Sequence, residues 1–463
     1  MIYNFQILRY FSNIGKKTPK ICIVGAGAAG FYCAQHFVKR IKDIQVSIFE
    51  KLPVPFGLVR FGVAPDHPEV KNVISKFFLT AEHPNVEFKG NISIGKDVSI
   101  SDLTEAYDYV LLAYGANFNR KLDIPGENLP NVIPARRIVG WYNGLPEEAG
   151  LKIDFSSEKV AIIGQGNVAI DVARILLKPV DDLKETDITQ HALESLMSSK
   201  IKEVHLIGRR GPLQAAFTIK ELREMLKLKG CGTYWNENDF VGVESVLPSL
   251  ERPRKRLTDL MLQSIKVQRE QYSEKKFFPV FYKSPLEINV LNNSIRKTIT
   301  LGINRLEKTD KGDTTISLTN TREMLQSDLI VTSIGYKAVT IDSSLPFDNK
   351  KGTVINQNGK IDNRLYAAGW VATGPTGVIL STMTNAFNTA EVICKEIEKN
   401  KTVWDKPGYE SIRNKLNKAN IQVVTWADWL KIDDYEKKAG QRCRKPREKI
   451  IDYEKMLEVA ANK

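Results

Sequence analysis

The sequence contains no pair of cysteines separated by two residues. Its five cysteines stand apart along the chain, at positions 22, 33, 231, 394 and 443. Zinc ribbons and iron–sulfur sites need cysteines at short, regular spacings, and disulfide scaffolds need many of them in a short chain. The cysteine pattern therefore argues against all three classes and favours a reducing compartment. We expect no bound metal ion.

Long apolar runs are also missing. None reaches the roughly 18 to 20 residues that span a membrane, so we expect at most peripheral membrane contact. Acidic residues are absent from residues 1–17, which carry Arg9, Lys16 and Lys17 among bulky apolar side chains. This composition is typical of a mitochondrial presequence, and an irregular basic tail is the alternative.

The charge is strongly positive, with a formal net value of +13. No helix-turn-helix, zinc-finger or RNA-binding motif accompanies it, so we expect no nucleic-acid partner. One interpretation is a generally basic composition or a basic targeting segment. The other is a basic face that meets an acidic partner. Both remain open at this point.

Residues 21–50 show the pattern of a dinucleotide-binding unit. An apolar strand ends at Gly25, a helix-like stretch follows, and a second strand ends in Glu50. Gly25, Gly27 and Gly30 have the G-x-G-x-x-G spacing, which permits a tight turn, close approach of a pyrophosphate and helix–strand packing. Glu50 is placed to accept hydrogen bonds from ribose hydroxyls. The pattern predicts a bound dinucleotide, with an ordinary α/β turn as the alternative.

A segment rich in proline and glycine, residues 51–72, follows this unit directly. Its composition predicts an irregular chain without a helix up to about Pro68. Because it comes straight after the ribose-binding acid, we expect it to lie across the cofactor. A surface loop is the alternative, which fits poorly with its many apolar residues.

A second unit of the same kind begins at Lys159. An apolar strand ends at Gly164, and Gly166 and Ala169 complete the fingerprint, which allows alanine as its third small residue. A long polar insertion, at about residues 179–200, separates the following helix from the next strand.

Arg209 and Arg210 stand at the end of that strand, where the first unit carries Glu50. An acid selects free ribose hydroxyls, whereas paired guanidiniums match a 2′-phosphate. One unit is therefore predicted to bind FAD or NAD and the other NADP, with a solvated basic turn as the alternative for the arginines. Two different nucleotides in one chain are typical of an electron-transferring flavoprotein.

The order of these elements predicts the domain organisation. A strand at 328–336 closes the second unit, and residues 361–370 return to the first. We predict an α/β fold with two Rossmann-like dinucleotide-binding domains, of which the FAD-binding domain is discontinuous. The predicted ranges are 1–17 for the presequence, 18–116 and 345–463 for the FAD-binding domain, and 117–344 for the NADP-binding domain.

The last segment, residues 400–463, is charged and helix-like. Its tryptophans, Trp404, Trp426 and Trp429, are interpreted as packing anchors rather than as a cofactor site. The helix before it is predicted to begin near Val378, where its N-terminus would face the flavin pyrimidine and favour an anionic reduced form.

Several longer motifs carry a resemblance to a known family. They are V-G-A-G-A-A-G-F-Y from residue 24, P-F-G-L-V-R-F-G-V-A-P-D-H-P-E-V-K-N from 55, G-Q-G-N-V-A from 164, G-R-R-G-P from 208, R-P-R-K-R from 252 and A-A-G-W from 367. On these motifs the chain resembles the adrenodoxin-type ferredoxin–NADP⁺ reductases from about Pro19 to its C-terminus. The motif from 55 is highly specific to that family, whereas the glycine motifs alone are not. Related two-nucleotide enzymes usually carry an aspartate where this chain has Trp370.

The resemblance implies which residues hold the cofactors. For FAD these are Gly25, Gly27, Ala29, Gly30, Glu50, Leu58, Ile94, Trp370, Gly377, Val378 and Ile379. For NADP they are Gln165, Gly166, Asn167, Val168, Arg209, Arg210, Glu221 and Gly377.

The resemblance also implies the reaction. Electrons would pass from NADPH through FAD, one at a time, to an acidic, adrenodoxin-like [2Fe–2S] ferredoxin that feeds cytochrome P450 or iron–sulfur and haem biosynthesis. Arg223, Arg252 and Arg256 would meet the ferredoxin, with Arg254 and Lys255 alongside; a solvated basic stretch is the alternative for the last two. The protein would lie in the mitochondrial matrix or on the matrix face of the inner membrane. A different flavoenzyme, such as a disulfide reductase or a glutamate-synthase-like module, and a non-catalytic flavin-binding protein are the alternatives.

His67 and Asp171 come from different predicted domains, and the resemblance implies that they meet near the flavin. We hypothesise a hydrogen-bonded, catalytic pair that sets the approach of the two domains or relays protons. A structural polar contact is an alternative of equal weight.

Overall fold

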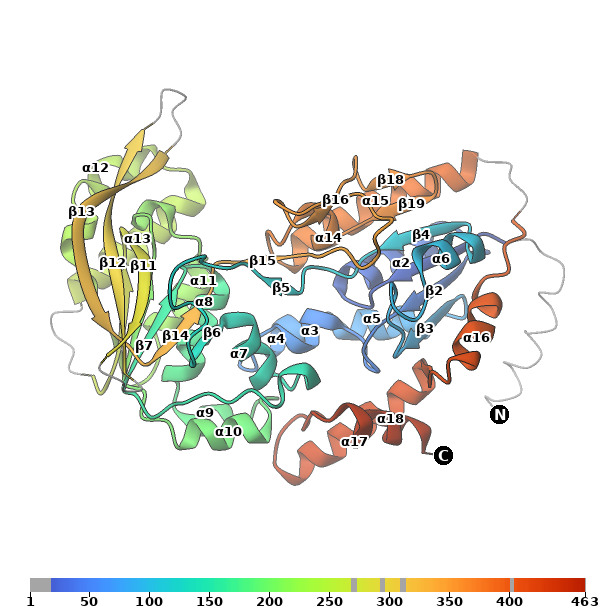
Figure 1. Ribbon diagram of the computed structural model, residues 1–463, viewed down its shortest axis with the longest axis horizontal. Coiled ribbons are helices and arrows are strands. Elements are labelled where there is room, and N and C mark those ends of the chain that lie inside the picture. The colour runs from blue at the N-terminus through green and yellow to red at the C-terminus, as the bar shows by residue number, and fades with distance from the viewer. Residues whose placement is uncertain (1–17, 268–272, 292–295, 309–313, 400–403, 463) are drawn as a thin grey trace.

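The computed structural model describes residues 18–267, 273–291, 296–308, 314–399 and 404–462 (Figure 1). The predicted presequence, residues 1–17, lies outside the described residues. The chain forms two lobes, each built on its own parallel sheet, which lie side by side along the longest axis of the molecule. No helix in the described part of the chain is both long enough and apolar enough to cross a membrane.

The first lobe contains a seven-stranded sheet. Its strands, in spatial order, are β18 (Lys360–Asp362), β19 (Leu365–Ala367), β4 (Tyr109–Leu112), β1 (Lys20–Val24), β2 (Gln45–Phe49), β3 (Val86–Gly90) and β20 (Val424–Thr425). The five central strands are parallel, with Ile21 of β1 paired to Val46 and to Tyr109. Because β19 pairs with β4, the chain returns to this sheet after leaving it, as the sequence predicts.

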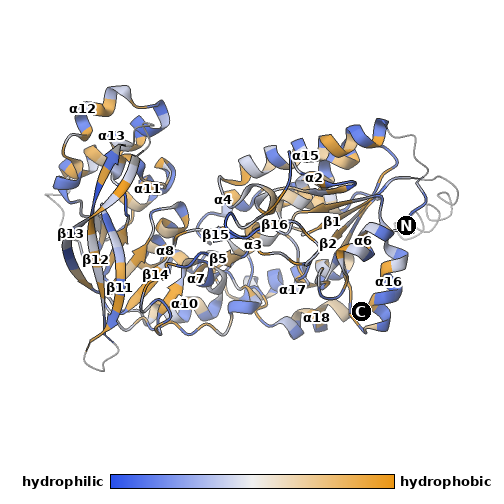
Figure 2. Cartoon of the chain, turned by 45° about the horizontal axis from the view of Figure 1, so that its top comes forward, coloured by the Kyte–Doolittle hydropathy of each residue, from blue (hydrophilic) through white to orange (hydrophobic). Residues whose placement is uncertain are grey.

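Helices cover both faces of this sheet, which explains why its strands are apolar throughout and not alternating. They are α2 (Ala28–Arg40), α5 (Ile74–Ala81) and α15 (Ile379–Lys399) on one face, and α6 (Ile100–Ala106) and α16 (Tyr409–Lys418) on the other. Along β1, Ile21 and Ile23 belong to the core under α2 and α15, and Cys22 and Val24 belong to the core under α6. Figure 2 shows these strands as apolar and the covering helices as polar on their outer sides.

The second lobe contains a six-stranded parallel sheet. Its strands, in spatial order, are β6 (Val132–Pro134), β14 (Leu329–Thr332), β7 (Lys159–Ile163), β8 (Glu203–Ile207), β10 (Lys275–Val280) and β9 (Cys231–Thr233). Its main helices are α7 (Ala135–Tyr142), α8 (Asn167–Leu177), α11 (Ile219–Leu226) and α13 (Arg252–Val267). An antiparallel sheet that the sequence analysis did not anticipate adjoins it, made of β11 (Lys283–Val290), β12 (Lys297–Lys308) and β13 (Thr314–Gln326).

Short elements complete the described chain. Strands β5 (Phe118–Asn119) and β15 (Tyr336–Lys337) pair with each other where the chain crosses between the lobes. The other short elements are β16 (Phe347–Asp348), β17 (Thr353–Val354), α12 (Val243–Val246), α14 (Trp370–Thr373), η1 (Pro146–Glu148), η2 (Pro212–Gln214), η3 (Glu237–Phe240) and η4 (Leu247–Ser249).

The segment 51–72 is less irregular than predicted. It contains α3 (Gly57–Phe61), so the prediction of no helix before Pro68 is wrong. Phe56, at φ 82°, and Gly57, at φ 47°, reverse the chain ahead of this helix. A proline restricts only its own position and the residue before it, so one helical turn fits between neighbouring prolines. The next helix, α4 (Pro68–Lys71), begins at the predicted residue.

The insertion at 179–200 also forms helices, namely α9 (Val180–Leu183) and α10 (Gln190–Met197). They bury Leu183 and Leu193 in the core of the second lobe. The insertion is therefore a packed part of this lobe and not only a polar loop.

The C-terminal segment adds α17 (Trp426–Arg442) and α18 (Tyr453–Ala461) along the lower edge of Figure 1. Trp429 is 1% exposed, and the Trp426 ring meets the Phe78 ring edge-on at 5.0 Å. Trp404 lies 6.2 Å from the Tyr109 ring. The prediction of three packing anchors is confirmed.

Candidate functional site

The first glycine turn forms a cradle at the carboxyl end of β1. Gly25 has φ 111°, and a Cβ atom there would lie 2.6 Å from the Ala113 carbonyl oxygen, so the turn requires glycine. Around Gly27 the space is open, because a Cβ atom would meet nothing within 4 Å. No side chain caps the N-terminus of α2, and its first turn holds no acid. These amides therefore suit a pyrophosphate.

The segment 51–72 lies against this cradle. The Phe56 amide donates to the Ala26 carbonyl oxygen at 2.8 Å, and a Cβ atom on Gly57 would lie 3.2 Å from the Gly27 Cα atom. Leu58 follows in α3. The segment is thus placed where the sequence analysis expects it to cross the cofactor.

Glu50 lies at the carboxyl end of β2 and is held by the backbone. Its Oε2 atom accepts from the Ala26 amide at 2.9 Å and its Oε1 atom from the Leu52 amide at 3.2 Å. Burial raises the pKa of this carboxyl, and the backbone donors oppose the rise. Each carboxylate oxygen keeps further acceptor capacity, which suits ribose hydroxyls.

The other wall of this cradle comes from the returning chain. Gly369 has φ 70°, and a Cβ atom there would lie 2.6 Å from that of Ala29, so the two segments touch. The Nε1 atom of Trp370 is buried and has no hydrogen-bond partner among the described residues. A buried indole donor normally finds a partner, and a flavin carbonyl would provide one. Trp426 and Trp429 also have indole nitrogens without a partner among the described residues, but Trp370 differs from them because it follows Gly369, which touches Ala29 of the cradle, and its donor is therefore the one placed to meet a flavin.

The remaining residues implied for FAD fall at two places. Gly377, at φ 79°, and Val378 precede α15, whose first residue is Ile379. Ile94 is 8% exposed, in the core on the α6 side of the sheet. The helix predicted from about Val378 thus begins one residue later.

The second glycine turn forms a matching cradle at the carboxyl end of β7. Gly164 has φ 120°, and a Cβ atom there would lie 2.1 Å from the Ser333 carbonyl oxygen. Gly166 again faces open space, and α8 begins at Asn167 without a side-chain cap. Val168 follows in the first turn, which also holds no acid. A second set of amides is therefore suited to phosphates.

Two side chains of this cradle brace the surrounding chain. Gln165 donates through Nε2 to the Val280 carbonyl oxygen at 2.9 Å, and the Asn167 Oδ1 atom accepts from the Thr218 amide at 2.8 Å. A Cβ atom on Gly208 would collide with the Gln165 side chain at 2.1 Å, which explains the glycine before the arginine pair.

Arg209 and Arg210 are exposed on a loop whose backbone is fixed. The Asn304 Nδ2 atom donates to the Arg209 carbonyl oxygen at 2.8 Å, and the Tyr282 amide donates to that of Arg210 at 3.2 Å. Within the described part of the chain, neither guanidinium forms an ion pair. Two cations at the end of β8 are thus available for an anion such as a 2′-phosphate.

A buried ionic cluster joins the two lobes beside these cradles. Arg174 of α8 is 2% exposed and contacts Asp66 of the first lobe through two nitrogens, at 2.8 and 3.0 Å. The same guanidinium lies 2.7 Å from Asp171 and 3.1 Å from Glu221. Lys178 adds a contact to Asp66 at 3.0 Å. Arg174 is therefore the cation that these carboxylates surround.

His67 enters this cluster with a partner that differs from the prediction. Its Nε2 atom lies 2.5 Å from Glu224 Oε2, so the predicted hydrogen bond to Asp171 is wrong. Asp171 is nonetheless close, because the candidate ligand atoms of His67, Asp171 and Glu221 all lie within 4.8 Å of one another. Arg174 draws the Asp171 carboxylate toward itself, and Glu224 takes its place at the histidine.

Glu221 makes the cluster sensitive to pH. Burial raises its pKa from 4.5 to about 8, and repulsion by Asp171 adds to the rise. The folded chain therefore binds this proton more tightly than the unfolded chain. The stability it contributes is complete below about pH 4.5 and is lost as the pH rises through about 8.

Without NADP, the melting temperature of the wild type should fall as the pH rises from about 5.5 to 8.5. We expect this fall to be smaller in Glu221→Gln. Glutamine keeps the size of the side chain but cannot titrate. Calorimetric midpoints at several pH values measure this, with Glu244→Gln, a change at an exposed site, as the control. Parallel pH profiles for wild type and Glu221→Gln would contradict the prediction.

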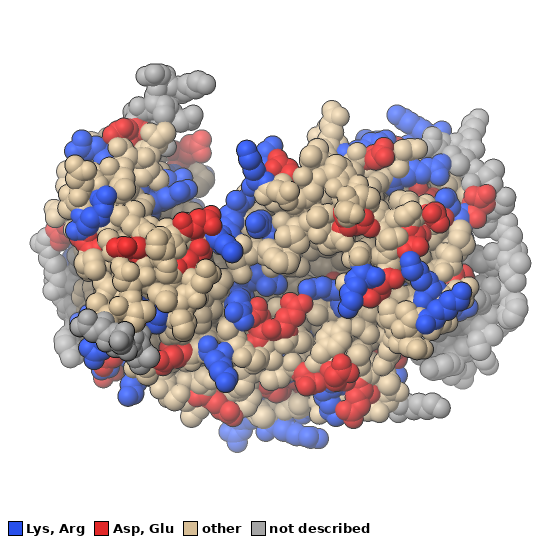
Figure 3. Space-filling view, in the orientation of Figure 1, with Lys and Arg blue, Asp and Glu red and all other residues tan. Residues whose placement is uncertain are grey.

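The three arginines implied for ferredoxin binding lie on neighbouring helices. Arg223 is exposed on α11, and Arg252 and Arg256 are exposed on α13, which packs against α11. Arg254 differs, because it is half-buried and donates to the Ala215 carbonyl oxygen at 2.7 Å. Lys255 is exposed. Figure 3 shows Lys and Arg side chains on both walls of a notch between the two lobes.

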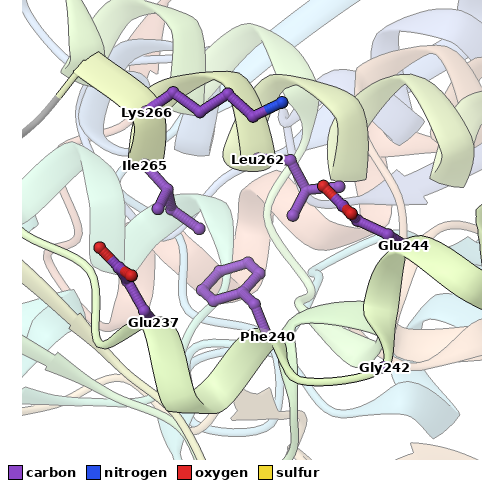
Figure 4. A pocket seen from close by; sticks show the side chains of 7 residues that line it. All are labelled: Glu237, Phe240, Gly242, Glu244, Leu262, Ile265 and Lys266. Atoms are coloured by element: carbon purple, nitrogen blue, oxygen red, sulfur yellow. The ribbon is translucent and has the colours of Figure 1, made fainter.

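A small pocket lies elsewhere on the second lobe (Figure 4). It is formed by η3, α12 and the far end of α13, and the side chains of Phe240, Leu262 and Ile265 point into it. Its volume of about 210 Å³ is below the roughly 300 to 1,000 Å³ typical of small-molecule sites. This pocket is therefore too small for a dinucleotide.

Four residues of this cluster were not predicted as functional from the sequence, namely Asp66, Arg174, Lys178 and Glu224. One signal was available for Arg174, because it is a charge among the apolar residues of α8, three residues after Asp171 and so on the same face of the helix. The others are ordinary charged residues whose partners lie more than 40 positions away in the sequence.

Comparisons with known proteins identify the family and the cofactors. Residues 19–238 match the family model described as pyridine nucleotide-disulphide oxidoreductase. Among solved structures, the chain is similar to Mycobacterium tuberculosis FprA in complex with NADPH, with a TM-score of 0.90 and 37% identity over 96% of this chain and 100% of that one.

Relatives extend over nearly the whole chain. It is 50% identical to NADPH:adrenodoxin oxidoreductase, mitochondrial, from Drosophila melanogaster, over 96% of this chain and 94% of that protein. It is 46% identical to the human and 39% identical to the Arabidopsis thaliana protein of the same name, over 96% and 99% of this chain and 92% and 99% of theirs. These names support a mitochondrial location. The chain belongs to the NADPH:adrenodoxin oxidoreductase family and is an NADPH-dependent oxidoreductase that uses FAD.

Proposed function

We propose that this protein passes electrons from NADPH through FAD, one at a time, to an acidic, adrenodoxin-like [2Fe–2S] ferredoxin of the mitochondrial matrix. The observation that carries the proposal is the group of exposed arginines on α11 and α13, Arg223, Arg252 and Arg256, in a chain with an FAD site and an NADP site. The names of its relatives support the identity of the acceptor.

Bound FAD supplies the chemistry, since it accepts two electrons as a hydride and can give them up singly. The chain's residues bind and orient. The cradle amides at Gly27 and Gly166 hold phosphates, Glu50 holds a ribose, and Arg209 with Arg210 select the 2′-phosphate. The buried donor of Trp370 would offer a bound flavin a hydrogen bond.

We propose that His67 and Asp171 handle protons near the flavin. The contact of His67 with Glu224 at 2.5 Å gives the imidazole a carboxylate neighbour, and the raised pKa of Glu221 supplies a group that holds a proton at neutral pH. A structural polar contact is the competing interpretation.

The division of the chain into domains is also proposed, as 18–116 with 345–463 for FAD and 117–344 for NADP. The pairing of Phe118–Asn119 with Tyr336–Lys337 supports it, because both crossings between the lobes lie side by side there.

The acceptor is tested with NADPH-driven reduction of cytochrome c, with and without a mitochondrial-type [2Fe–2S] ferredoxin, at low and high salt. We expect turnover to require the ferredoxin and to fall with salt, because exposed charges are screened. The double variant Arg252→Gln/Arg256→Gln is expected to raise the KM for ferredoxin by about 10-fold or more.

Two controls sharpen this prediction. Ferricyanide reduction should be unchanged in the double variant, because a small anion does not need the docking surface. Arg442→Gln, at an exposed site near the end of α17, should leave the KM for ferredoxin unchanged. Turnover that does not need the ferredoxin would refute the proposed acceptor. A KM for ferredoxin that is unchanged in Arg252→Gln/Arg256→Gln would refute the proposed docking surface.

A further inference from the structure

Three segments that are distant in sequence meet at one half-buried aspartate. Asp187, between α9 and α10 of the second lobe, contacts Lys71 of the first lobe through Oδ1 at 2.6 Å. Its Oδ2 atom lies 2.9 Å from the Nζ atom of Lys449, which follows α17 in the C-terminal segment. The Lys449 side chain is 1% exposed. One carboxylate thus connects the second lobe to two separate parts of the first.

A second contact fixes the same segment to the start of α10. We call residues 443–452, between α17 and α18, the C-terminal strap. Glu448 of the strap accepts from the amide of Gln190, the first residue of α10, at 2.8 Å. Thr189 stands at the N-cap without capping the helix itself, so the strap supplies the missing carboxylate. Lys445, which is also buried, pairs with Glu448.

The other side of the strap is anchored in the first lobe. Glu436 of α17 is fully buried and lies 2.5 Å from Arg60 of α3 and 3.1 Å from Arg447 of the strap. The Ile450 amide donates to Glu436 at 3.0 Å, and the Ile450 side chain belongs to the core of the first lobe. The strap is therefore a rigid part of the first lobe that reaches across to the second.

This arrangement is costly as a source of stability alone. One carboxylate faces both the buried ammonium group of Lys449 and that of Lys71, which is 12% exposed, so two cations share a single counter-charge. Burial lowers the pKa of both Lys71 and Lys449, with that of Lys449 falling to about 7. Buried ion pairs often contribute little net stability, but they allow only a narrow range of geometries. A role in orientation explains the cluster better than a role in stability.

Neither lysine belongs to a glycine cradle. The contact between Lys71 and Asp187 nonetheless joins chain segments that lead from the two cradles. Lys71 ends the helix that follows His67, and Asp187 lies on the insertion that follows α8, the helix that begins at the second cradle. A shift at Asp187 therefore changes how α8 approaches segment 51–72. Displacements of about 1 Å between reacting groups can cost roughly 100-fold in rate.

We propose that Asp187 is a positioning residue, which clamps the NADP-binding lobe to Lys71 and to Lys449 of the C-terminal strap at the separation that hydride transfer from NADPH to FAD requires. The inference depends on the two cofactor sites and not on the identity of the electron acceptor.

The test compares wild type, Asp187→Asn and Asp187→Glu, each loaded with FAD. Stopped-flow reduction of the flavin by NADPH without oxygen measures hydride transfer, and titration with NADP⁺ measures binding. For Asp187→Asn we expect hydride transfer to slow by about 10- to 100-fold, with a change in Kd for NADP⁺ of less than about 3-fold. Asp187→Glu, which keeps the charge, should recover part of the rate.

Hydrogen exchange provides a second measurement that does not depend on turnover. Hydrogen exchange should increase in the strap and at the start of α10 in Asp187→Asn, whereas exchange in β1 and β7 should be unchanged. Asp181→Asn is the matched control, because Asp181 lies in the same insertion, with a side chain that is 83% exposed, and pairs only with Lys184 among the described residues.

A second variant separates positioning from stability. Asp187→Asn alone leaves Lys71 and the buried Lys449 without this counter-charge, whereas Asp187→Asn/Lys449→Met also removes the buried cation. We expect the double variant to regain thermal stability but not the rate of hydride transfer. A wild-type rate in either variant, or a rate that recovers together with stability, would overturn the proposal. Failure of ferredoxin reduction alone would affect only the proposed acceptor, because flavin reduction is measured here without one.

Discussion

Replacing Arg209 and Arg210 together with glutamine is expected to raise the KM for NADPH by about 100-fold and to leave the KM for NADH almost unchanged. Hydrogen bonds to charged groups contribute about 1.5 to 3 kcal/mol each, and two of them at the lower end of this range, about 3 kcal/mol together, correspond to a factor of this size. Steady-state ferricyanide reduction with each nucleotide measures the effect without involving a protein partner.

The loop around the arginines makes this prediction sharp. Its backbone is held by Asn304 and Tyr282, so glutamine at both positions should alter charge without releasing the loop. Arg305→Gln, an exposed site on neighbouring β12, serves as the control and should change neither KM. Equal increases for NADPH and NADH would mean that the pair does not read the 2′-phosphate.

Replacing Arg174 with methionine is expected to lower the free energy of unfolding by about 3 to 5 kcal/mol, the usual cost of leaving a buried charge unpaired. Methionine fills much of the space of the arginine stem, so the loss reports the missing cation. Asp66 would keep only Lys178, and Asp171 would lose the guanidinium at 2.7 Å. Urea unfolding of the FAD-loaded protein, followed by tryptophan fluorescence, measures the change.

The comparison for this variant is Lys184→Met. Lys184 forms an exposed ion pair with Asp181 three residues away, and such pairs contribute about 0 to 1 kcal/mol. Similar losses in the two variants would show that Arg174 is not the centre of a buried cluster. The deficit of Arg174→Met should also shrink in acid, because Arg174 and Lys178 hold the pKa of Asp66 well below its usual range in the wild type.

Local patterns explain why both cradles were predictable. A strand, a glycine turn and a helix can be recognised within about 30 residues of sequence, and the ribose-contacting residue follows at the end of the next strand. Glu50 and the Arg209–Arg210 pair could therefore be located by counting along the chain. The strands at β1, β2, β7 and β8 lie where their apolar runs indicate.

The contacts between the lobes could not be predicted in the same way. His67 had three carboxylates within reach, at Asp171, Glu221 and Glu224, and the last two are one helical turn apart on α11. Which of them meets the imidazole depends on where Arg174 draws the others, and that is a property of packing between helices. No residue spacing in the sequence predicts which carboxylate contacts His67.

The segment 51–72 shows a related limit. Proline and glycine counts argue against regular structure, yet α3 forms because Phe56 takes a left-handed conformation that lets the chain turn into one helical turn. The conformation of a single residue decided the outcome. Composition averages over such residues.

The return of the chain to its first sheet has a consequence for biogenesis. The strands β4, β1, β2 and β3 are made first, but both outer edges of this four-stranded core are covered late, by β19 beside β4 and by β20 beside β3. During vectorial synthesis or import, both edges of the early core therefore stay unpaired until more than 200 further residues, mainly those of the second lobe, have been added. Open edges invite pairing with other chains. Nascent chains that end before β19 should accordingly depend on chaperones far more than the finished protein does.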